Sequence, residues 1–107
     1  MLAPSKQVVV FVADKIQGKI IEVDPQGDLI TDIGHEQWDR INRSSETKVI
    51  VDEEHETFGL FGLDHQQPPM TFIAITEPEK PLRLHLVSDS ASMMLGVRAG
   101  ASVEVVW

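Results

Sequence analysis

Short apolar runs separated by polar turns recur along the chain. The clearest is LRLHLV at residues 82–87, where three leucines alternate with Arg83 and His85. A period of two places the leucines on one face of a β-strand and the arginine and histidine on the other. β-Branched and aromatic residues, which are typical of strands, dominate the other runs. The runs that predict further strands are QVVVFVA (7–13), KIIEV (19–23), DLITDI (28–33), TKVIV (47–51), FGLFGL (58–63), TFIAI (71–75) and SVEVVW (102–107).

Turn and cap residues divide these runs. Residues 24–27, DPQG, predict a hairpin turn, because proline presets φ and glycine tolerates positive φ. Residues 35–43, HEQWDRINR, suit one or two helical turns with Trp38 and Ile41 facing the protein body. Residues 88–96, SDSASMMLG, begin with capping residues and end in glycine, which predicts a second short helix. Glycines at 59 and 62 indicate a bend, a bulge or a close backbone approach.

Seven or eight short strands with two small helices predict an all-β fold, a small antiparallel barrel or sandwich. Closing such a sheet removes the exposed edges that promote aggregation. The 107 residues correspond to the size of one domain. We therefore expect a single β-barrel domain over residues 1–107, in which residues 1–17 supply an extra N-terminal strand and residues 18–107 form the barrel.

Charge and composition narrow the class of function. Seventeen acidic and nine basic residues give a net charge of −8, which repels nucleic acid. The absence of cysteine excludes disulfides, thiolate nucleophiles and cysteine-bound zinc, and it fits a reducing compartment. The apolar run at residues 8–12 is too short for a signal peptide or a membrane span. We expect a cytoplasmic protein with neither nucleic-acid nor membrane partners.

Two segments resemble one known family. Residues 18–33, GKIIEVDPQGDLITDI, follow the pattern G-x-V-x-x-V-D-x-F-G-N-L-I-T-N-I. Residues 82–107 follow L-E-I-A-V-N-x-G-S-A-A-x-x-L-G-L-K-x-G-D-x-V-x-V. Both patterns are typical of the C-terminal β-barrel domain of the S-adenosyl-L-methionine hydroxide adenosyltransferases, the family that includes the fluorinases and chlorinases. The two segments, of 16 and 26 residues, cover 42 of the 107 positions, and residues 34–81 match only in being rich in strands.

The resemblance implies a role for the barrel. In that family an N-terminal α/β domain carries the chemistry at the 5′ carbon, and the barrel's asparagines and backbone recognise adenine. Substrate lies between the α/β domain of one subunit and the barrel of its neighbour in a trimer. Because this chain resembles the barrel alone, we expect no catalytic residue, metal or cofactor. The implied partners are a small molecule of the nucleoside or adenosyl class and either further copies of the chain or a separate catalytic subunit.

Departures from the family pattern fall at polar positions. Glutamine replaces the family's phenylalanine, aspartates replace two asparagines, and valine replaces a third. An ionised aspartate only accepts hydrogen bonds, whereas asparagine also donates them, so recognition of adenine must differ here. Ordinary turn and cap chemistry is the alternative role for these aspartates and serines. The candidate ligand-binding residues are Gln26, Asp28, Thr31, Asp32, Val87, Ser88 and Ser90.

Other clusters indicate chemistry less strongly. Residues 52–56, DEEHE, offer metal-ligand atoms, but consecutive loop residues do not converge without a defined turn, so we expect a solvated loop. The four histidines, His35, His55, His65 and His85, show no zinc-binding spacing, and His85 is expected at the surface or at a subunit contact. Several large apolar side chains are expected in the core: Phe58, Phe61, Phe72, Met93 and Met94.

Three interpretations of function remain open. The leading one is a non-catalytic domain for small-molecule binding or assembly that resembles the adenosyltransferase barrel. The second is one half of a split enzyme whose catalytic α/β domain is a separate chain. The third is a purely structural barrel related to other L-G-x-x-x-G barrels, such as those that close over molybdopterin cofactors in larger oxidoreductases.

Overall fold

The computed structural model describes residues 14–41 and 46–107, so the predicted strand at residues 7–13 lies outside the described residues. Within these described residues, eight strands and two short helices confirm the predicted all-β fold. In chain order the elements are β2 (Lys15–Val23), β3 (Leu29–Thr31), α1 (His35–Trp38), β4 (Lys48–Val51), β5 (His55–Phe58), β6 (Leu60–Phe61), β7 (Phe72–Ile75), β8 (Arg83–Leu86), α2 (Ala91–Leu95) and β9 (Ser102–Val106).

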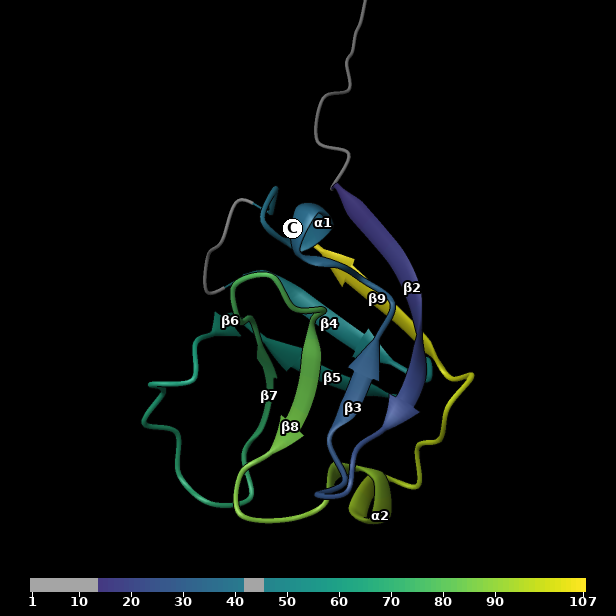
Figure 1. Ribbon diagram of the computed structural model, residues 1–107, viewed down its shortest axis with the longest axis vertical. Helices are drawn as coiled ribbons and strands as arrows, with labels where there is room; N and C mark the ends of the chain where they lie inside the picture. Colours follow the sequence, from purple (N-terminus) through teal and green to yellow (C-terminus); the bar gives the residue numbers. More distant parts are fainter. Residues whose placement is uncertain (1–13, 42–45) are drawn as a thin grey trace, which may run out of the picture.

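The strands form one sheet in the order β5-β4-β9-β2-β3-β8-β7-β6, which curls into a nearly closed barrel (Figure 1). Neighbouring strands are antiparallel except β6 and β7, which run parallel. The barrel nearly closes because the two outermost strands, β5 and β6, are separated in sequence by Gly59 alone. At this seam the Thr57 hydroxyl donates a hydrogen bond to the Phe72 carbonyl oxygen over 2.6 Å.

The core lies inside the barrel and follows the alternation of the strands. Leu82, Leu84 and Leu86 are buried, as the period of two predicts. Trp38 and Ile41 are also buried, so the short helix does face the body. The rest of the apolar core comprises Ile20, Leu29, Ile33, Val49, Val51, Ala74, Ala91, Val97, Val103 and Val105.

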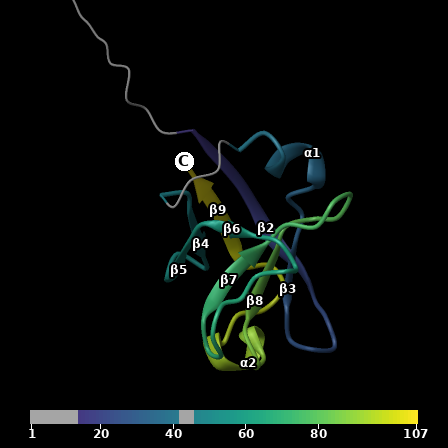
Figure 2. The ribbon, with the colours of Figure 1, turned by 90° about the vertical axis from the view of Figure 1, so that its left-hand side faces the viewer.

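The two helices lie at opposite ends of the barrel (Figures 1 and 2). Ser90 caps the N-terminus of α2 through a hydrogen bond to its side chain from Met93 N, and Gly96 ends it with φ of 69°. Both features agree with the predicted caps. Neither helix within residues 14–41 and 46–107 combines the length and the apolar character that crossing a membrane requires.

Several local expectations were wrong. FGLFGL is not one strand, because Gly59, with φ of +85°, separates β5 from β6; the bend expected at this glycine is confirmed. The acidic segment is only partly a loop, since β5 already begins at His55. Phe58 is 55% exposed, Met93 84% and Met94 54%, so these side chains lie outside the core. The methionines face outward because the five-residue helix α2 buries only Ala91.

Candidate functional site

The turn between β2 and β3 is organised by the Asp24 side chain. Its Oδ1 accepts hydrogen bonds from the backbone N–H groups of Gln26 and Asp28, each over 2.9 Å. The backbone adds a bond from Gly27 N to Asp24 O and one from Asp24 N to Asp28 O. An aspartate that bonds the backbone ahead of it is common turn chemistry, so Asp24 is a structural residue here. The turn presents the Gln26 side chain to solvent.

This turn packs against the start of α2. Gly27 O accepts a hydrogen bond from Ser92 N over 2.9 Å. A Cβ atom at position 27 would collide with Ser90, so glycine permits the close approach. The two motifs that resemble the adenosyltransferase pattern therefore meet at one end of the barrel, although they are distant in sequence.

A pocket of about 250 Å³ opens where the turn and α2 meet. Gln26 and Ser90 both line it, so the structure brings these two predicted ligand residues together. Ser90 Oγ already accepts the capping bond from Met93 N over 3.2 Å, and its hydroxyl can still donate. The other lining residues are Val23, Asp24, Pro25, Gly27, Ser92 and Met93, which combine a polar rim with exposed apolar surface.

Thr31 and Asp32 hold the backbone together. The buried Thr31 hydroxyl donates to Leu82 O over 2.7 Å and accepts from Ile33 N over 3.1 Å. Asp32 Oδ1 accepts from Lys19 N over 2.9 Å across the hairpin. Both side chains are therefore engaged by the protein backbone, which agrees with the structural role and not with ligand binding.

Val87 and Ser88 follow β8 and do not line the pocket. The backbone of Val87 bonds Thr71 O through its N–H and Met70 N through its carbonyl. Ser88 is exposed, and its φ of 68° places it in a tight turn rather than at a helix cap. The predicted ligand set therefore separates into different parts of the fold.

Among the buried polar residues of the described part of the chain, Asp28 is the one with a carboxylate, and it is 3% exposed. Its Oδ1 lies 2.7 Å from His85 Nδ1, and its Oδ2 lies 3.6 Å from Arg83 Nε. An ionised carboxylate only accepts hydrogen bonds, so His85 Nδ1 is the donor in this contact with Asp28. Arg83 Nη2 also approaches Glu77 Oε1 at 3.4 Å. The Asp28 carboxylate is thus engaged by side chains of the protein itself.

His85 and Arg83 were not predicted as partners of Asp28. The expectation of a surface histidine is only partly right, because the His85 side chain is 25% exposed and is bonded to a buried carboxylate. The alternation in residues 82–87 does place both residues on one face. The pairing of Leu29 with Leu84 and of Ile30 with Arg83 extends to Asp28 opposite His85. That register was not available from the sequence.

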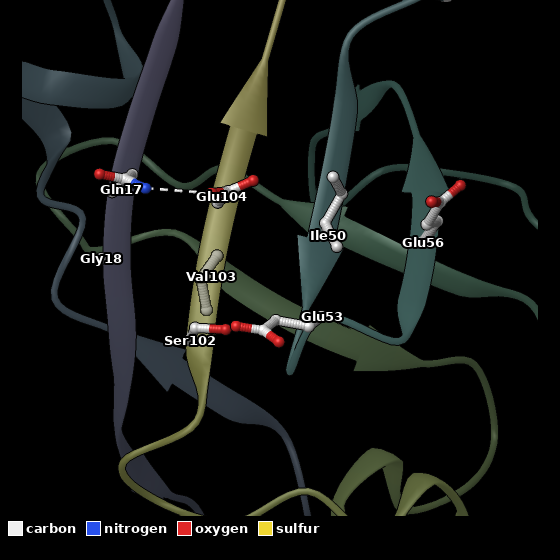
Figure 3. A pocket seen from close by; sticks show the side chains of 8 residues that line it. All are labelled: Gln17, Gly18, Ile50, Glu53, Glu56, Ser102, Val103 and Glu104. Carbon is white, nitrogen blue, oxygen red and sulfur yellow. Dashed lines mark hydrogen bonds between the residues drawn. The ribbon is translucent and has the colours of Figure 1, made fainter.

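A hollow of about 430 Å³ lies over β2, β9 and β4 (Figure 3). Glu53, Glu56 and Glu104 line it, together with Ser102. Gln17 Nε2 donates to Glu104 Oε2 over 3.0 Å, and Lys15 Nζ lies 3.4 Å from the same oxygen. The Gln17 amide, followed by the Lys15 ammonium, holds the pKa of Glu104 below its usual value. Lys48 approaches Glu56 at 4.0 Å, so two of the three carboxylates have cationic neighbours.

Metal ligation is not favoured by the geometry. Across residues 14–41 and 46–107, no group of three or more histidine and carboxylate side chains is placed to hold a metal ion. His65 and His85 come within 6.1 Å between ring centroids. His65 Nδ1 accepts a hydrogen bond from Gln67 N over 3.2 Å.

Comparison with known proteins supports the fold alone. No protein-family model matches the sequence, and no curated protein matches it significantly. The structure is similar to a crystal structure of an uncharacterized conserved protein from Thermotoga maritima, with a TM-score of 0.69, 18% identity and 96% of this chain covered. The structure is also similar to a crystal structure of a conserved hypothetical protein from Thermus thermophilus, with a TM-score of 0.60, 17% identity and 83% of this chain covered. The match spans 40% and 32% of those longer chains.

Proposed function

We propose that this chain is a non-catalytic barrel domain that binds a small molecule of the nucleoside or adenosyl class at the pocket between the β2–β3 turn and α2. The observation that carries the proposal is the convergence of Gln26 and Ser90 on that pocket. Both residues belong to the segments that resemble the adenosyltransferase barrel. The polar rim offers donors and acceptors to a base or ribose, and Val23 and Met93 offer apolar surface to a flat ring.

The arrangement of Asp28 changes the expected mode of recognition. Its carboxylate is engaged by His85 and Arg83 and is buried, so it does not reach the turn pocket as an open acceptor. Recognition here instead relies on the Gln26 amide and the Ser90 hydroxyl, each of which can donate and accept.

Assembly is the second part of the proposal. Two exposed apolar side chains line the pocket, Val23 at 36% and Met93 at 84%, and Ile21, two positions before Val23, is 51% exposed. The pairing of β2 with β3 shifts register between Ile20 and Glu22, which places Ile21 at an irregularity of the strand. This surface can contact a ligand or a neighbouring subunit, and a ligand bound between two chains would be shielded from water on both sides.

Isothermal titration with adenosine and with S-adenosyl-L-methionine tests the binding proposal. We expect saturable binding of at least one of them, and Gln26→Ala should raise its Kd by about five- to tenfold, the value of one hydrogen bond. Gln26 is exposed in the turn, so its loss should not affect folding.

Gln66→Ala is the matched control, because Gln66 is exposed and lies outside the pocket. Its Kd should equal that of the unmodified protein. The proposal would be contradicted if neither adenosine nor S-adenosyl-L-methionine bound, or if Gln26→Ala and Gln66→Ala raised the Kd equally.

The alternative function is the barrel subunit of a split S-adenosyl-L-methionine hydrolase or halogenase. One observation favours it: the barrel accounts for only 40% of the Thermotoga maritima chain, so that protein has a large part beyond the shared fold. A separately encoded α/β chain would then supply catalysis. Co-purification of such a chain with this one, and hydrolysis of the sulfonium substrate only by the mixture, would support the alternative.

A further inference from the structure

A third pocket, of about 200 Å³, lies on the outer face of the barrel away from the turn. Arg83 faces Ile30 across β3 and Ile75 across β7, so these three side chains stand side by side. Leu29, Leu84 and Ala74 alternate with them and are fully buried in the core, which places the trio on the opposite, outer face. Residues after β7 complete the lining, namely Glu77, Lys80 and Pro81.

The wall formed by residues 76–81 is held in place by the neighbouring helix and strands. Trp38 Nε1 donates to Lys80 O over 2.7 Å, and Glu79 N donates to His35 Nδ1 over 3.1 Å. Leu82 N bonds Ile33 O over 2.8 Å. Since these contacts tie the wall to α1 and its flanking residues, the pocket is preformed.

Arg83 is oriented in this pocket but is not saturated by its partners. Its Nη2 lies 3.4 Å from Glu77 and its Nε lies 3.6 Å from Asp28. Charge-assisted hydrogen bonds between nitrogen and a carboxylate are usually about 2.7–2.9 Å long. A guanidinium has five N–H donors, so two long contacts leave it able to bind a further carboxylate in a forked geometry. Lys80, 3.2 Å from Glu77, adds a second cation at the rim.

The lining therefore combines both signs of charge with an apolar floor. Arg83 and Lys80 suit a carboxylate, Glu77 suits an ammonium group, and Ile30, Ile75 and Pro81 suit a short aliphatic chain. The volume is below the roughly 300–1,000 Å³ typical of pockets for drug-sized ligands, which indicates a smaller metabolite. We propose that this pocket binds a small aliphatic α-amino acid, with leucine as the probe.

Leucine and two analogues test the proposal directly. 4-Methylpentanoate lacks the amino group of leucine, and 3-methylbutylamine lacks its carboxylate. In ligand titrations followed by ¹H–¹⁵N NMR, leucine should shift amides of residues 75–83 and saturate, and each analogue should bind at least about tenfold more weakly. No saturable shift with leucine, or equal binding by 4-methylpentanoate, would overturn the proposal.

Substitutions assign the charges. Glu77→Gln removes the proposed partner of the leucine ammonium group, so it should raise the Kd of leucine at least about tenfold. 4-Methylpentanoate, which has no ammonium group, should bind as well as before or better. Glu79→Gln is the matched control, because Glu79 lies in the same loop, is exposed and does not line the pocket. Equal effects of both substitutions on leucine would contradict the assignment. Gln26→Ala should leave leucine binding unchanged, which separates this site from the turn pocket.

Discussion

Asp28 illustrates how one residue changes what a surface can recognise. The family pattern has an asparagine there, and this chain has a carboxylate that is 3% exposed and held by a histidine and an arginine. A buried carboxylate must have such partners, because an unpaired buried charge is costly. The residue thus serves the connection between β3 and β8 rather than an open ligand edge.

Replacing Asp28 by alanine should destabilise the protein by about 1–3 kcal/mol, because His85 and Arg83 would lose their acceptor. The side chains of both partners, Arg83 and His85, are 25% exposed, so solvent screening keeps the loss of stability below that of a fully buried pair. Urea denaturation measures the free energy of unfolding. The exposed Asp64→Ala should change it by less than about 0.5 kcal/mol, and equal losses for the two would refute this role of Asp28.

Glu104 provides a test of the electrostatics in the hollow over β2, β9 and β4. Its pKa is lowered first by the Gln17 amide and then by Lys15, so Gln17→Leu should move the pKa of Glu104 up toward the ordinary value. Because the folded-state pKa is depressed, the contribution of this carboxylate to stability is present above the unfolded-state pKa and is lost as pH falls through the folded-state pKa. An NMR titration of the side-chain carboxyl group measures the pKa of Glu104, with Gln66→Leu at an exposed position as the control. An unchanged pKa of Glu104 after Gln17→Leu would refute the role of the Gln17 amide.

Among the elements, the contact between the β2–β3 turn and α2 positions the proposed ligand site. Gly27 and Gly100 both have positive φ, of 90° and 98°, but only a Cβ at position 27 would collide with a neighbour, Ser90. Gly100→Ala should lower the free energy of unfolding by about 1–2 kcal/mol through backbone strain alone. Gly27→Ala should cost at least about 1 kcal/mol more, from overpacking. Thermal unfolding of the two variants measures the difference, and equal losses would show that the turn does not press on α2.

Local patterns predicted the elements well and their contacts poorly. The strand at β8, the turn at residues 24–27 and the caps of α2 all follow from residues close in sequence, and the structure confirms them. The bond between Asp28 and His85 depends on the register of β3 against β8, which no local pattern specifies. Met93 was misplaced because α2 is too short to bury more than one side of a single turn.

At the scale of the whole molecule, the order of the strands in the sheet brings the candidate site together. The meeting of Gln26 with Ser90 was not expected as a pocket, since it requires the sheet order that joins β2, β3 and β8. The structures from Thermotoga maritima and Thermus thermophilus share this fold at low identity, so they support the architecture and leave the ligand to experiment.

The central claim is that the barrel binds a nucleoside-type ligand where the β2–β3 turn meets α2. Its most direct test is a titration of the ¹⁵N-labelled protein with adenosine, followed by backbone amide chemical shifts. The account predicts saturable shifts at residues 23–28 and 90–93, with little change on the groove of β2, β9 and β4. Saturable shifts confined to another face, or none at millimolar adenosine, would contradict it.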